Sequence, residues 1–209
     1  MITTQQTHLD LTNNNDKRSE PIECLGMTFK NHDTQKKHFL KILHKKLTNP
    51  KFQKTPGFPK GSDEAILKMS DPPYYTACPN PFLADFIRIY GKPYNASEPY
   101  EREPVAVDVN VDKTDSIYTA HSYHTKVPYL AIVPSILHYT APGDIVLDAF
   151  CGSGQTGVAA TMCGAASPEL RAQIDQEMGK PVLWGARHCV LSDLAPAATF
   201  ISHNYNLLS

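Results

Sequence analysis

The sequence predicts an α/β fold with a parallel sheet, and two successive strand–helix pairs in its last third carry this prediction. Residues 145–148 form a short apolar strand, and residues 155–163 after it have a helical composition. Residues 188–193 form a second apolar strand, which a helical pattern over 195–205 follows. Strands that alternate with helices in this way favour a right-handed crossover and a parallel sheet.

Apolar periodicity predicts further elements along the chain. Helical spacing indicates helices over 36–47 and 127–139. The short apolar run 64–70 fits a buried strand or a short helix, and alternating valines over 105–111 favour a strand. The polar segment 165–181, which separates the two strand–helix pairs, has a helical composition of its own around Pro168–Met178.

Length and composition narrow the class of protein. With 209 residues the chain fits one domain with an extension, and we place a polar, Lys-rich extension at 1–60 and the main domain at 61–209. A net charge of −1 argues against a polybasic nucleic-acid binder. The sequence has no apolar run of ~18 residues, so we expect no membrane span. The polar N-terminus does not fit a signal peptide.

Five cysteines are scattered along the chain, and none forms a Cys-x-x-Cys pair. We therefore expect no disulfide framework and no metal site. This cysteine usage fits a reducing compartment, and we expect the protein in the cytoplasm.

The strongest local signal is a glycine turn between the strand 145–148 and its helix. The pattern D-x-F-x-G-x-G-x-T comprises Asp148, Phe150, Gly152, Gly154 and Thr156. Glycines let the backbone pass close to a ligand, and a helix N-terminus offers free amide donors and positive potential. A carboxylate at the strand end can hold a ligand's ammonium group. The pattern predicts a cofactor site, and we expect a branched side chain at Gly154 to abolish binding without unfolding the chain.

Two classes of cofactor fit this turn. Gly152, Gly154 and Gly157 match the G-x-G-x-x-G spacing of dinucleotide-binding proteins, so a nicotinamide or flavin enzyme is the formal competitor. The Asp-x-Phe before the glycines favours S-adenosylmethionine (SAM) instead.

Asp193 ends the second apolar strand, where a carboxylate can accept hydrogen bonds from two ribose hydroxyls. It lies 39 residues after Gly154, further than the usual ~20 residues, and the insert 165–181 accounts for the excess. The alternative is that Asp193 caps the helix that follows. We favour ribose binding.

The tetrapeptide Asp71, Pro72, Pro73 and Tyr74 combines a carboxylate, two prolines and an aromatic ring. Two prolines fix the backbone and remove two amide donors, which leaves rigid carbonyl acceptors. An exocyclic amine needs such acceptors to orient its protons, and Asp71 and the Pro72 carbonyl can supply them. Tyr74 can stack on a base taken out of a duplex. The alternative is a plain proline turn.

Residues 35–60 contain eight lysines and no acidic residue. Such a segment can be a phosphate-contacting face beside a nucleic acid or a solvated helix face with a basic loop. We favour the solvated face, because no arginine or stacking pattern accompanies the lysines.

These motifs resemble those of the DNA N6-adenine and N4-cytosine methyltransferases. Residues 71–74 are similar to the D/N/S-P-P-Y/F/W catalytic motif of this family, and residues 148–154 to its D-x-F-x-G-x-G cofactor motif. The segment 124–128, His-Thr-Lys-Val-Pro, is loosely similar to the His-Thr-Lys-Pro element of one permuted class, in which it helps enclose the methionine end of SAM.

The resemblance implies a Rossmann-like SAM-dependent fold that transfers a methyl group to an adenine or cytosine amino group in DNA. It assigns the base to Asp71, Pro72, Pro73 and Tyr74. It assigns the cofactor to Thr125, Lys126, Asp148, Phe150, Gly152, Gly154, Thr156 and Asp193.

The spacing departs from the family pattern. Only about 75 residues separate the two motifs, and 16 residues follow Asp193. We therefore expect an incomplete domain, the N-terminal fragment of a longer methylase, which a second polypeptide or a missing C-terminal region completes. Two other functions stay open, a non-catalytic SAM- or DNA-binding subunit and an RNA or protein amino-methyltransferase. Asp71 favours DNA, because the RNA and protein enzymes more often carry Asn there.

Overall fold

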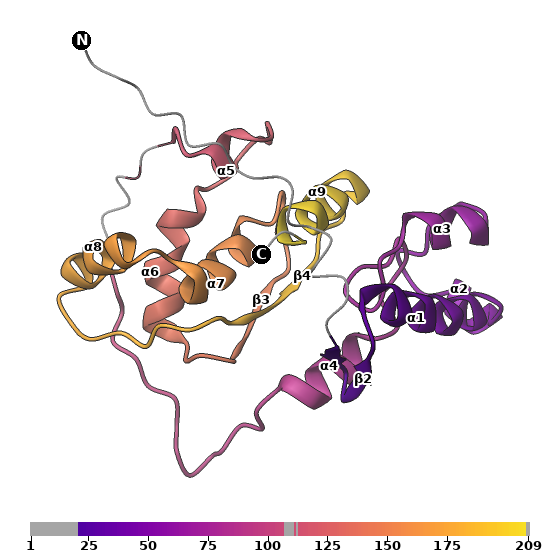
Figure 1. Cartoon of the computed structure of the whole chain (residues 1–209), viewed down its shortest axis with the longest axis horizontal. Coiled ribbons are helices and arrows are strands. Elements are labelled where there is room, and N and C mark those ends of the chain that lie inside the picture. The colour runs from indigo at the N-terminus through magenta and orange to yellow at the C-terminus, as the bar shows by residue number, and fades with distance from the viewer. Residues whose placement is uncertain (1–20, 107–110, 112, 208–209) are drawn as a thin grey trace. The chain divides into compact units, whose positions relative to one another are not determined.

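The computed structural model describes residues 21–106, 111 and 113–207, and the chain divides into two units, Met1–Ile89 and Tyr90–Ser209. Figure 1 traces the chain through both units by colour. Residues 1–20 and most of the strand expected over 105–111 lie outside the described part. Among the described residues, no helix is long and apolar enough to cross a membrane.

The first unit is mostly helical and contains one antiparallel hairpin. Its elements are β1 (Ile22–Cys24), β2 (Met27–Phe29), α1 (His32–Leu47), α2 (Pro50–Gln53), α3 (Asp63–Met69) and α4 (Leu83–Tyr90). The predicted helix over 36–47 is confirmed as α1. It begins earlier than expected because Asn31 and Thr34 form a capping box, in which Asn31 Oδ1 accepts from Thr34 N at 3.0 Å and Thr34 Oγ1 accepts from Asn31 N at 3.2 Å.

The core of the first unit lies on one face of α1. Phe39, Leu43 and Leu47 follow one another at intervals of four residues, and all three are fully buried. Phe39 packs edge-on against Phe82, with ring centroids 5.3 Å apart at 79°. This apolar stripe therefore anchors α1 to the chain segment that leads into α4.

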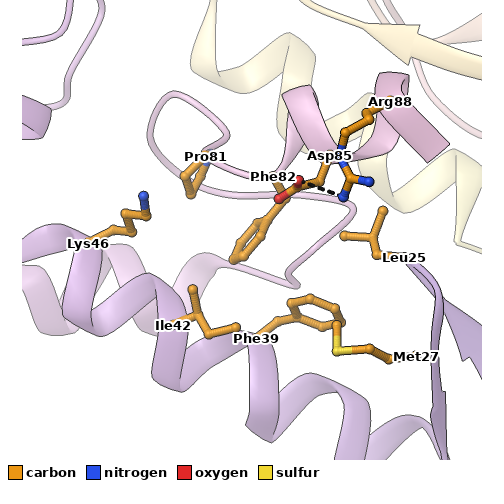
Figure 2. A pocket seen from close by; sticks show the side chains of 9 residues that line it. All are labelled: Leu25, Met27, Phe39, Ile42, Lys46, Pro81, Phe82, Asp85 and Arg88. Carbon is orange, nitrogen blue, oxygen red and sulfur yellow. Dashed lines mark hydrogen bonds and ion pairs between the residues drawn. The ribbon is translucent and has the colours of Figure 1, made fainter. Parts of the chain in front are cut away.

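A pocket of about 220 Å³ lies beside this core (Figure 2). It is mostly apolar, and one ion pair lines it, in which Arg88 Nη2 lies 3.1 Å from Asp85 Oδ1. The lining residues are Leu25, Met27, Phe39, Ile42, Lys46, Pro81, Phe82, Asp85 and Arg88. None of the residues predicted for the functional site is among them, so this pocket is not formed by the motifs.

Residues 63–69 form the helix α3, so the strand alternative for this apolar run does not apply. Ser62 is the N-cap, and its side chain accepts a hydrogen bond from Ala65 N at 3.2 Å. Ile66 is buried, and α3 packs against α1. The domain boundary that we expect after residue 60 therefore lies inside the first unit, whose contacts continue to Ile89.

The second unit contains the predicted parallel strands. Its elements are α5 (Ser116–Thr119), α6 (Tyr129–Tyr139), β3 (Ile145–Asp148), α7 (Gln155–Ala165), α8 (Pro168–Met178), β4 (His188–Leu191) and α9 (Pro196–Asn206). β3 and β4 pair in parallel, from Ile145 opposite His188 to Asp148 opposite Leu191. The predicted pairing is confirmed, and the strands and helices expected over 127–205 form within two residues of their predicted ends.

Helix α7 is the centre of this unit and packs against α6, β4 and α9. Its buried residues include Ala159, Ala160 and Cys163, and Val133 of α6 is fully buried against this cluster. Small side chains let α7 approach its neighbours closely. Leu147 of β3, by contrast, exposes 69% of its surface, although both faces of a parallel sheet are usually covered.

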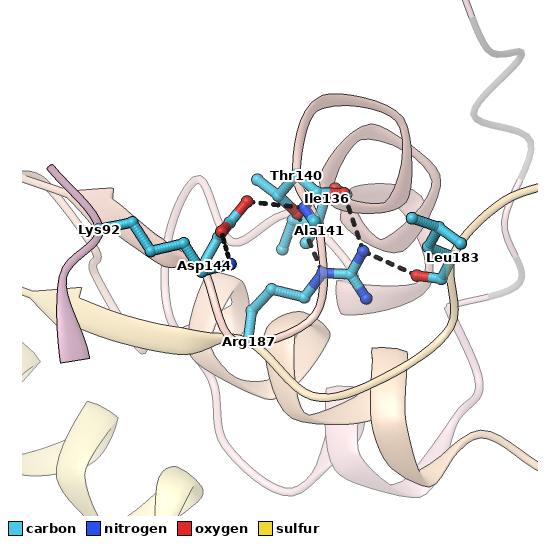
Figure 3. Close-up of polar contacts among 7 residues, drawn as sticks. All are labelled: Lys92, Ile136, Thr140, Ala141, Asp144, Leu183 and Arg187. Atoms are coloured by element: carbon cyan, nitrogen blue, oxygen red, sulfur yellow. Dashed lines mark hydrogen bonds and ion pairs between the residues drawn. The ribbon is translucent and has the colours of Figure 1, made fainter. Parts of the chain in front are cut away.

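The buried side chain of Arg187 joins the segments that lead into β3 and β4 (Figure 3). Its Nε donates to Thr140 Oγ1 at 3.0 Å, and its Nη2 donates to Thr140 O at 2.9 Å and to Leu183 O at 2.8 Å. Its Nη1 donates to Gly185 O at 2.5 Å. Burial lowers the pKa of this side chain. One planar donor group thus satisfies backbone acceptors that precede both β3 and β4.

Replacing Arg187 by Lys should lower the free energy of unfolding of the second unit by about 1–3 kcal/mol, because an ammonium group cannot reach these separated acceptors and leaves buried carbonyls unpaired. Urea unfolding followed by the fluorescence of Trp184, the single tryptophan of the chain, would measure the loss. The exposed Arg102→Lys is the control. Equal stability of the two variants would contradict this account.

Candidate functional site

The carboxyl ends of β3 and β4 lie side by side because the strands are parallel neighbours. β3 ends at Asp148, and Asp193 follows the end of β4 by two residues. Backbone hydrogen bonds extend the pairing past the strands, from Ser192 N to Asp148 O at 3.0 Å and from Cys151 N to Ser192 O at 2.9 Å. Two carboxylates from distant parts of the sequence therefore share one edge of the sheet, the edge at which open α/β sheets bind ligands.

The Asp148 carboxylate is held by two donors from its own motif. Its Oδ2 accepts from Thr156 Oγ1 at 2.6 Å, and its Oδ1 accepts from Phe150 N at 3.1 Å. Thr156 lies in the first turn of α7, so the carboxylate links the strand end to the helix start. The spacing of Asp148, Phe150 and Thr156 thus has a structural basis within the turn itself.

Asp193 links the second strand to the same turn. Its Oδ2 accepts from Gly152 N at 2.9 Å, and its Oδ1 accepts from Ala195 N at 2.9 Å. The N-cap of α9 is Ala195, which makes no side-chain cap bond, so Asp193 is not the helix N-cap. One of its oxygens faces the glycine turn instead.

Gly152 and Gly154 both have left-handed backbone conformations, with φ of 51° and 82°. A Cβ on Gly154 would overlap Ser202 Oγ and stand 2.8 Å from Ser202 Cβ, and Asn206 Nδ2 donates to Gly154 O at 3.3 Å. Helix α9 therefore packs directly on this glycine. A branched side chain at Gly154 would disturb the packing of α9 as well, and the expected loss of binding at this position stays a prediction.

Gly157, the third glycine of the dinucleotide-like spacing, serves the packing of α7. A Cβ at this position would overlap Asn206 and stand 2.7 Å from Leu191 Cδ1. Close helix–strand approach accounts for the residue. The third glycine of dinucleotide-binding folds has the same packing role, so the structure at Gly157 does not distinguish the two classes of cofactor.

The segment that contains Thr125 and Lys126 lies against the glycine turn. A Cβ on Gly152 would stand 3.0 Å from Cε1 of Tyr123, a residue that we did not predict from the sequence. Lys126 Nζ donates to the carbonyls of Tyr118 and His121 and lies 4.2 Å from the centre of the Tyr118 ring. Burial lowers the pKa of Lys126. Lys126 thus holds the loop closed through backbone contacts.

Thr125 is one of two non-glycine residues with positive φ among the described residues, at 63°. A β-branched residue is a true outlier in this region. Such strain costs about 1–3 kcal/mol and persists where the surrounding contacts impose it, often at functional sites. Thr125 precedes Lys126 in the closed loop, and its Oγ1 donates to His124 O at 2.5 Å.

The turn contains an exposed aromatic ring and several buried polar atoms. Phe150 exposes 80% of its surface. Ser153 Oγ and both amide atoms of Gln155 are buried and have no hydrogen-bond partner within the described part of the chain. The start of α7 therefore has hydrogen-bonding capacity that the described protein atoms do not use.

In the first unit, residues 71–74 form a closed loop. Asp71 N donates to Tyr75 O at 2.9 Å and Tyr75 N donates to Asp71 O at 3.0 Å, so the ends of the loop are joined. The peptide bond between Pro72 and Pro73 is cis, and both prolines are buried. Tyr74 exposes 55% of its surface. The loop presents an aromatic side chain on a fixed backbone.

Three residues outside the motif hold this loop, and we did not predict any of them. Lys36 Nζ forms an ion pair with Asp71 Oδ1 at 2.7 Å, and Gln35 Nε2 donates to Tyr74 OH at 3.2 Å. Asn80 Nδ2 donates to Pro73 O at 2.9 Å. One signal could have identified Gln35, which is a polar residue within the apolar i, i+4 stripe of α1.

The two predicted groups belong to different units of the chain. Residues 71–74 lie in Met1–Ile89, and all the predicted cofactor residues lie in Tyr90–Ser209. Within the second unit the structure brings Asp148, Gly152, Gly154 and Asp193 into one turn, and places the loop of Thr125 beside it through Tyr123.

Gly154→Ala should destabilise the second unit more than Gly143→Ala does. Both glycines have φ near 80°, so both variants carry left-handed strain of roughly 1–2 kcal/mol. Only the Cβ at 154 also collides with Ser202, since nothing lies within 4 Å of a Cβ at 143. Urea unfolding followed by Trp184 fluorescence measures the difference, and Ser202→Gly should relieve part of it. Equal losses at the two positions would refute the packing role.

Comparison with known proteins identifies the family of the chain. The sequence matches the family model described as DNA methylase over residues 6–167, which is more than half of the chain. The match includes residues 71–74 and the turn from Asp148 to Thr156, and it ends before Asp193. No curated protein and no solved structure matches the chain. The chain belongs to the DNA methylase family, the methyltransferases that act on N6 of adenine or N4 of cytosine in DNA.

Proposed function

We propose that the chain binds SAM at the turn between β3 and α7 and directs its methyl group to an exocyclic amine of adenine or cytosine. The observation that carries the proposal is the pair of carboxylates, Asp148 and Asp193, held at one sheet edge by the N–H groups and hydroxyl of the turn. The Rossmann-like architecture is part of the proposal. The parallel pairing of β3 and β4, with α7 between them in the sequence, supports it.

The donor set of this turn suits SAM. The resemblance assigns Asp148, Phe150, Gly152, Gly154 and Thr156 to SAM, and Asp193 to its ribose hydroxyls. Each carboxylate oxygen that already accepts one hydrogen bond keeps capacity for a second. The exposed ring of Phe150 offers an apolar surface at the turn, and Thr125 and Lys126 belong to the loop that Tyr123 holds against Gly152. When bound, SAM supplies a methyl group on a positively charged sulfur.

The loop at 71–74 is the part that we assign to the base. A primary amine has two N–H donors, and Asp71 and the Pro72 carbonyl are acceptors suited to them. Proline has no N–H to compete for these acceptors. The Pro73 carbonyl is already engaged by Asn80, whereas no described hydrogen bond involves the Pro72 carbonyl. Orientation of the amine protons, and with them of the nitrogen lone pair, is the catalytic contribution of these groups.

DNA is the proposed partner, in agreement with the family, and a base turned out of the duplex would stack on Tyr74. The competing hypothesis of a non-catalytic subunit predicts SAM binding without methyl transfer. RNA and protein substrates are tested by the same transfer assay. The partner polypeptide expected from the sequence stays a prediction.

Asp193→Asn and Asp148→Asn should each weaken SAM binding by roughly tenfold or more, because a hydrogen bond to a charged group contributes about 1.5–3 kcal/mol. Titration calorimetry of the full chain with SAM measures this. Asp175→Asn, on α8 of the same unit, is the matched control. Unchanged affinity in folded variants at both 148 and 193 would remove the proposed cofactor site.

Tyr74→Ala and Asp71→Ala should abolish or strongly reduce methyl transfer to unmethylated plasmid DNA while leaving SAM affinity unchanged. Loss of one base-stacking contact costs about 1–3 kcal/mol, so DNA binding should weaken as well for Tyr74→Ala. Tyr94→Ala removes an exposed tyrosine side chain outside the loop and is the control. Full transfer activity in the Tyr74 and Asp71 variants would show that the loop does not hold the base.

A further inference from the structure

We infer that Gln35 and Lys36, neighbouring residues of α1, are positioning residues. They fix the orientation of two side chains of the loop, the Asp71 carboxylate and the Tyr74 ring. The inference rests on the proposed function of the loop. It extends the methyltransferase machinery to a helix that lies 35 residues upstream of the motif.

The ion pair between Lys36 and Asp71 fixes the direction of the carboxylate. Lys36 Nζ lies 2.7 Å from Oδ1, and the two side chains expose 48% and 26% of their surface. Ion pairs as exposed as this one contribute little to stability, because solvent screens them. Stability is therefore a weak explanation for it. Orientation is a better one, because an acceptor for an amine must point in one direction.

Gln35 fixes the orientation of the Tyr74 ring. It is 3% exposed and occupies the apolar stripe of α1, where an amide is costly unless it is paired. Its Nε2 donates to Tyr74 OH at 3.2 Å, and its Oε1 contacts His32 Nδ1 at 3.2 Å. An apolar residue would fill the stripe equally well for packing. The amide holds the hydroxyl end of Tyr74, while more than half of the side chain stays exposed for a base.

Both contacts arise from the first turns of a single rigid element. The capping box at Asn31 and Thr34 fixes the start of α1, and the buried stripe fixes its rotation. Gln35 and Lys36 therefore hold the aromatic ring and the carboxylate in fixed positions relative to one another. A loop ordered before the base arrives loses less conformational freedom on binding, and an offset of about 1 Å at a reacting group can cost roughly 100-fold in rate.

The chain offers a matched control in Lys37. Lys36→Met and Lys37→Met remove the same charge from adjacent residues of the same helix, and Lys37 is exposed and forms no ion pair among the described residues. We expect Lys36→Met to lower kcat for methylation of unmethylated plasmid DNA roughly 10- to 100-fold more than Lys37→Met does, with equal KM for SAM. Lys36→Arg should restore most of the rate. Equal kcat values for the two Met variants would overturn the role of Lys36.

A binding measurement tests Gln35 without turnover. The probe is a single-stranded oligonucleotide that carries 2-aminopurine, whose fluorescence falls when it stacks on an aromatic ring. Gln35→Met should reduce the quenching, Tyr74→Phe should reduce it similarly, and the double variant should show no further loss. Additive losses would overturn the role of Gln35. Unfolding curves identify any variant that loses its fold, and for such a variant Tyr74→Phe provides the test from the other side of the bond.

The outcomes separate the inference from the proposed function. If Asp71→Ala and Tyr74→Ala keep full methyl transfer, the loop does not hold the base and the proposed function of the loop fails. If those two variants lose activity while Lys36→Met matches Lys37→Met and Gln35→Met keeps full quenching, only the inference fails.

Discussion

The hydrogen bond from Gly152 N to the Asp193 carboxylate ties together the two strand ends on which the proposed cofactor site depends. β3 and β4 supply only four residues each, so the pairing within the strands is short. The bonds between Asp148, Ser192 and Cys151 continue it into the loops, and the carboxylate of Asp193 completes it at the turn. Because these bonds use the backbone of the turn, the geometry of the glycines and the position of the second strand are set together.

The same constraint gives the glycine motif a role in the packing of the second unit. Gly154 lacks a side chain because α9 packs against it through Ser202 and Asn206, and Gly157 lacks one because β4 and α9 approach it closely. Asp148 and Thr156 bond to one another across the start of α7. The residues proposed to bind the cofactor thus also hold the packing, so loss of a ligand and loss of packing have to be measured separately in any variant.

In the first unit, a different set of contacts fixes the loop at residues 71–74. The prolines restrict the backbone, the bonds between Asp71 and Tyr75 close the loop, and Asn80 engages the Pro73 carbonyl. Gln35 and Lys36 then act on the side chains from α1. The helix is held in turn by its buried stripe of Phe39, Leu43 and Leu47. The loop therefore depends on the core of the unit through side chains that sequence motifs do not include.

The sequence by itself determined the local elements and the chemistry of the motifs. Hydrophobic periodicity and the glycine turn are local signals, so α1, α6 and the run from β3 to α9 follow from short windows of residues. The run at 64–70 was ambiguous by periodicity, and the cap at Ser62 together with packing on α1 made it a helix. Only the tertiary structure decided the contacts between distant residues: Asp193 with Gly152, Ser202 with Gly154, Tyr123 with Gly152, and Lys36 with Asp71. Such pairs leave no periodic trace in a single sequence, because their separation is set by how packed elements meet and not by the repeat of any one element.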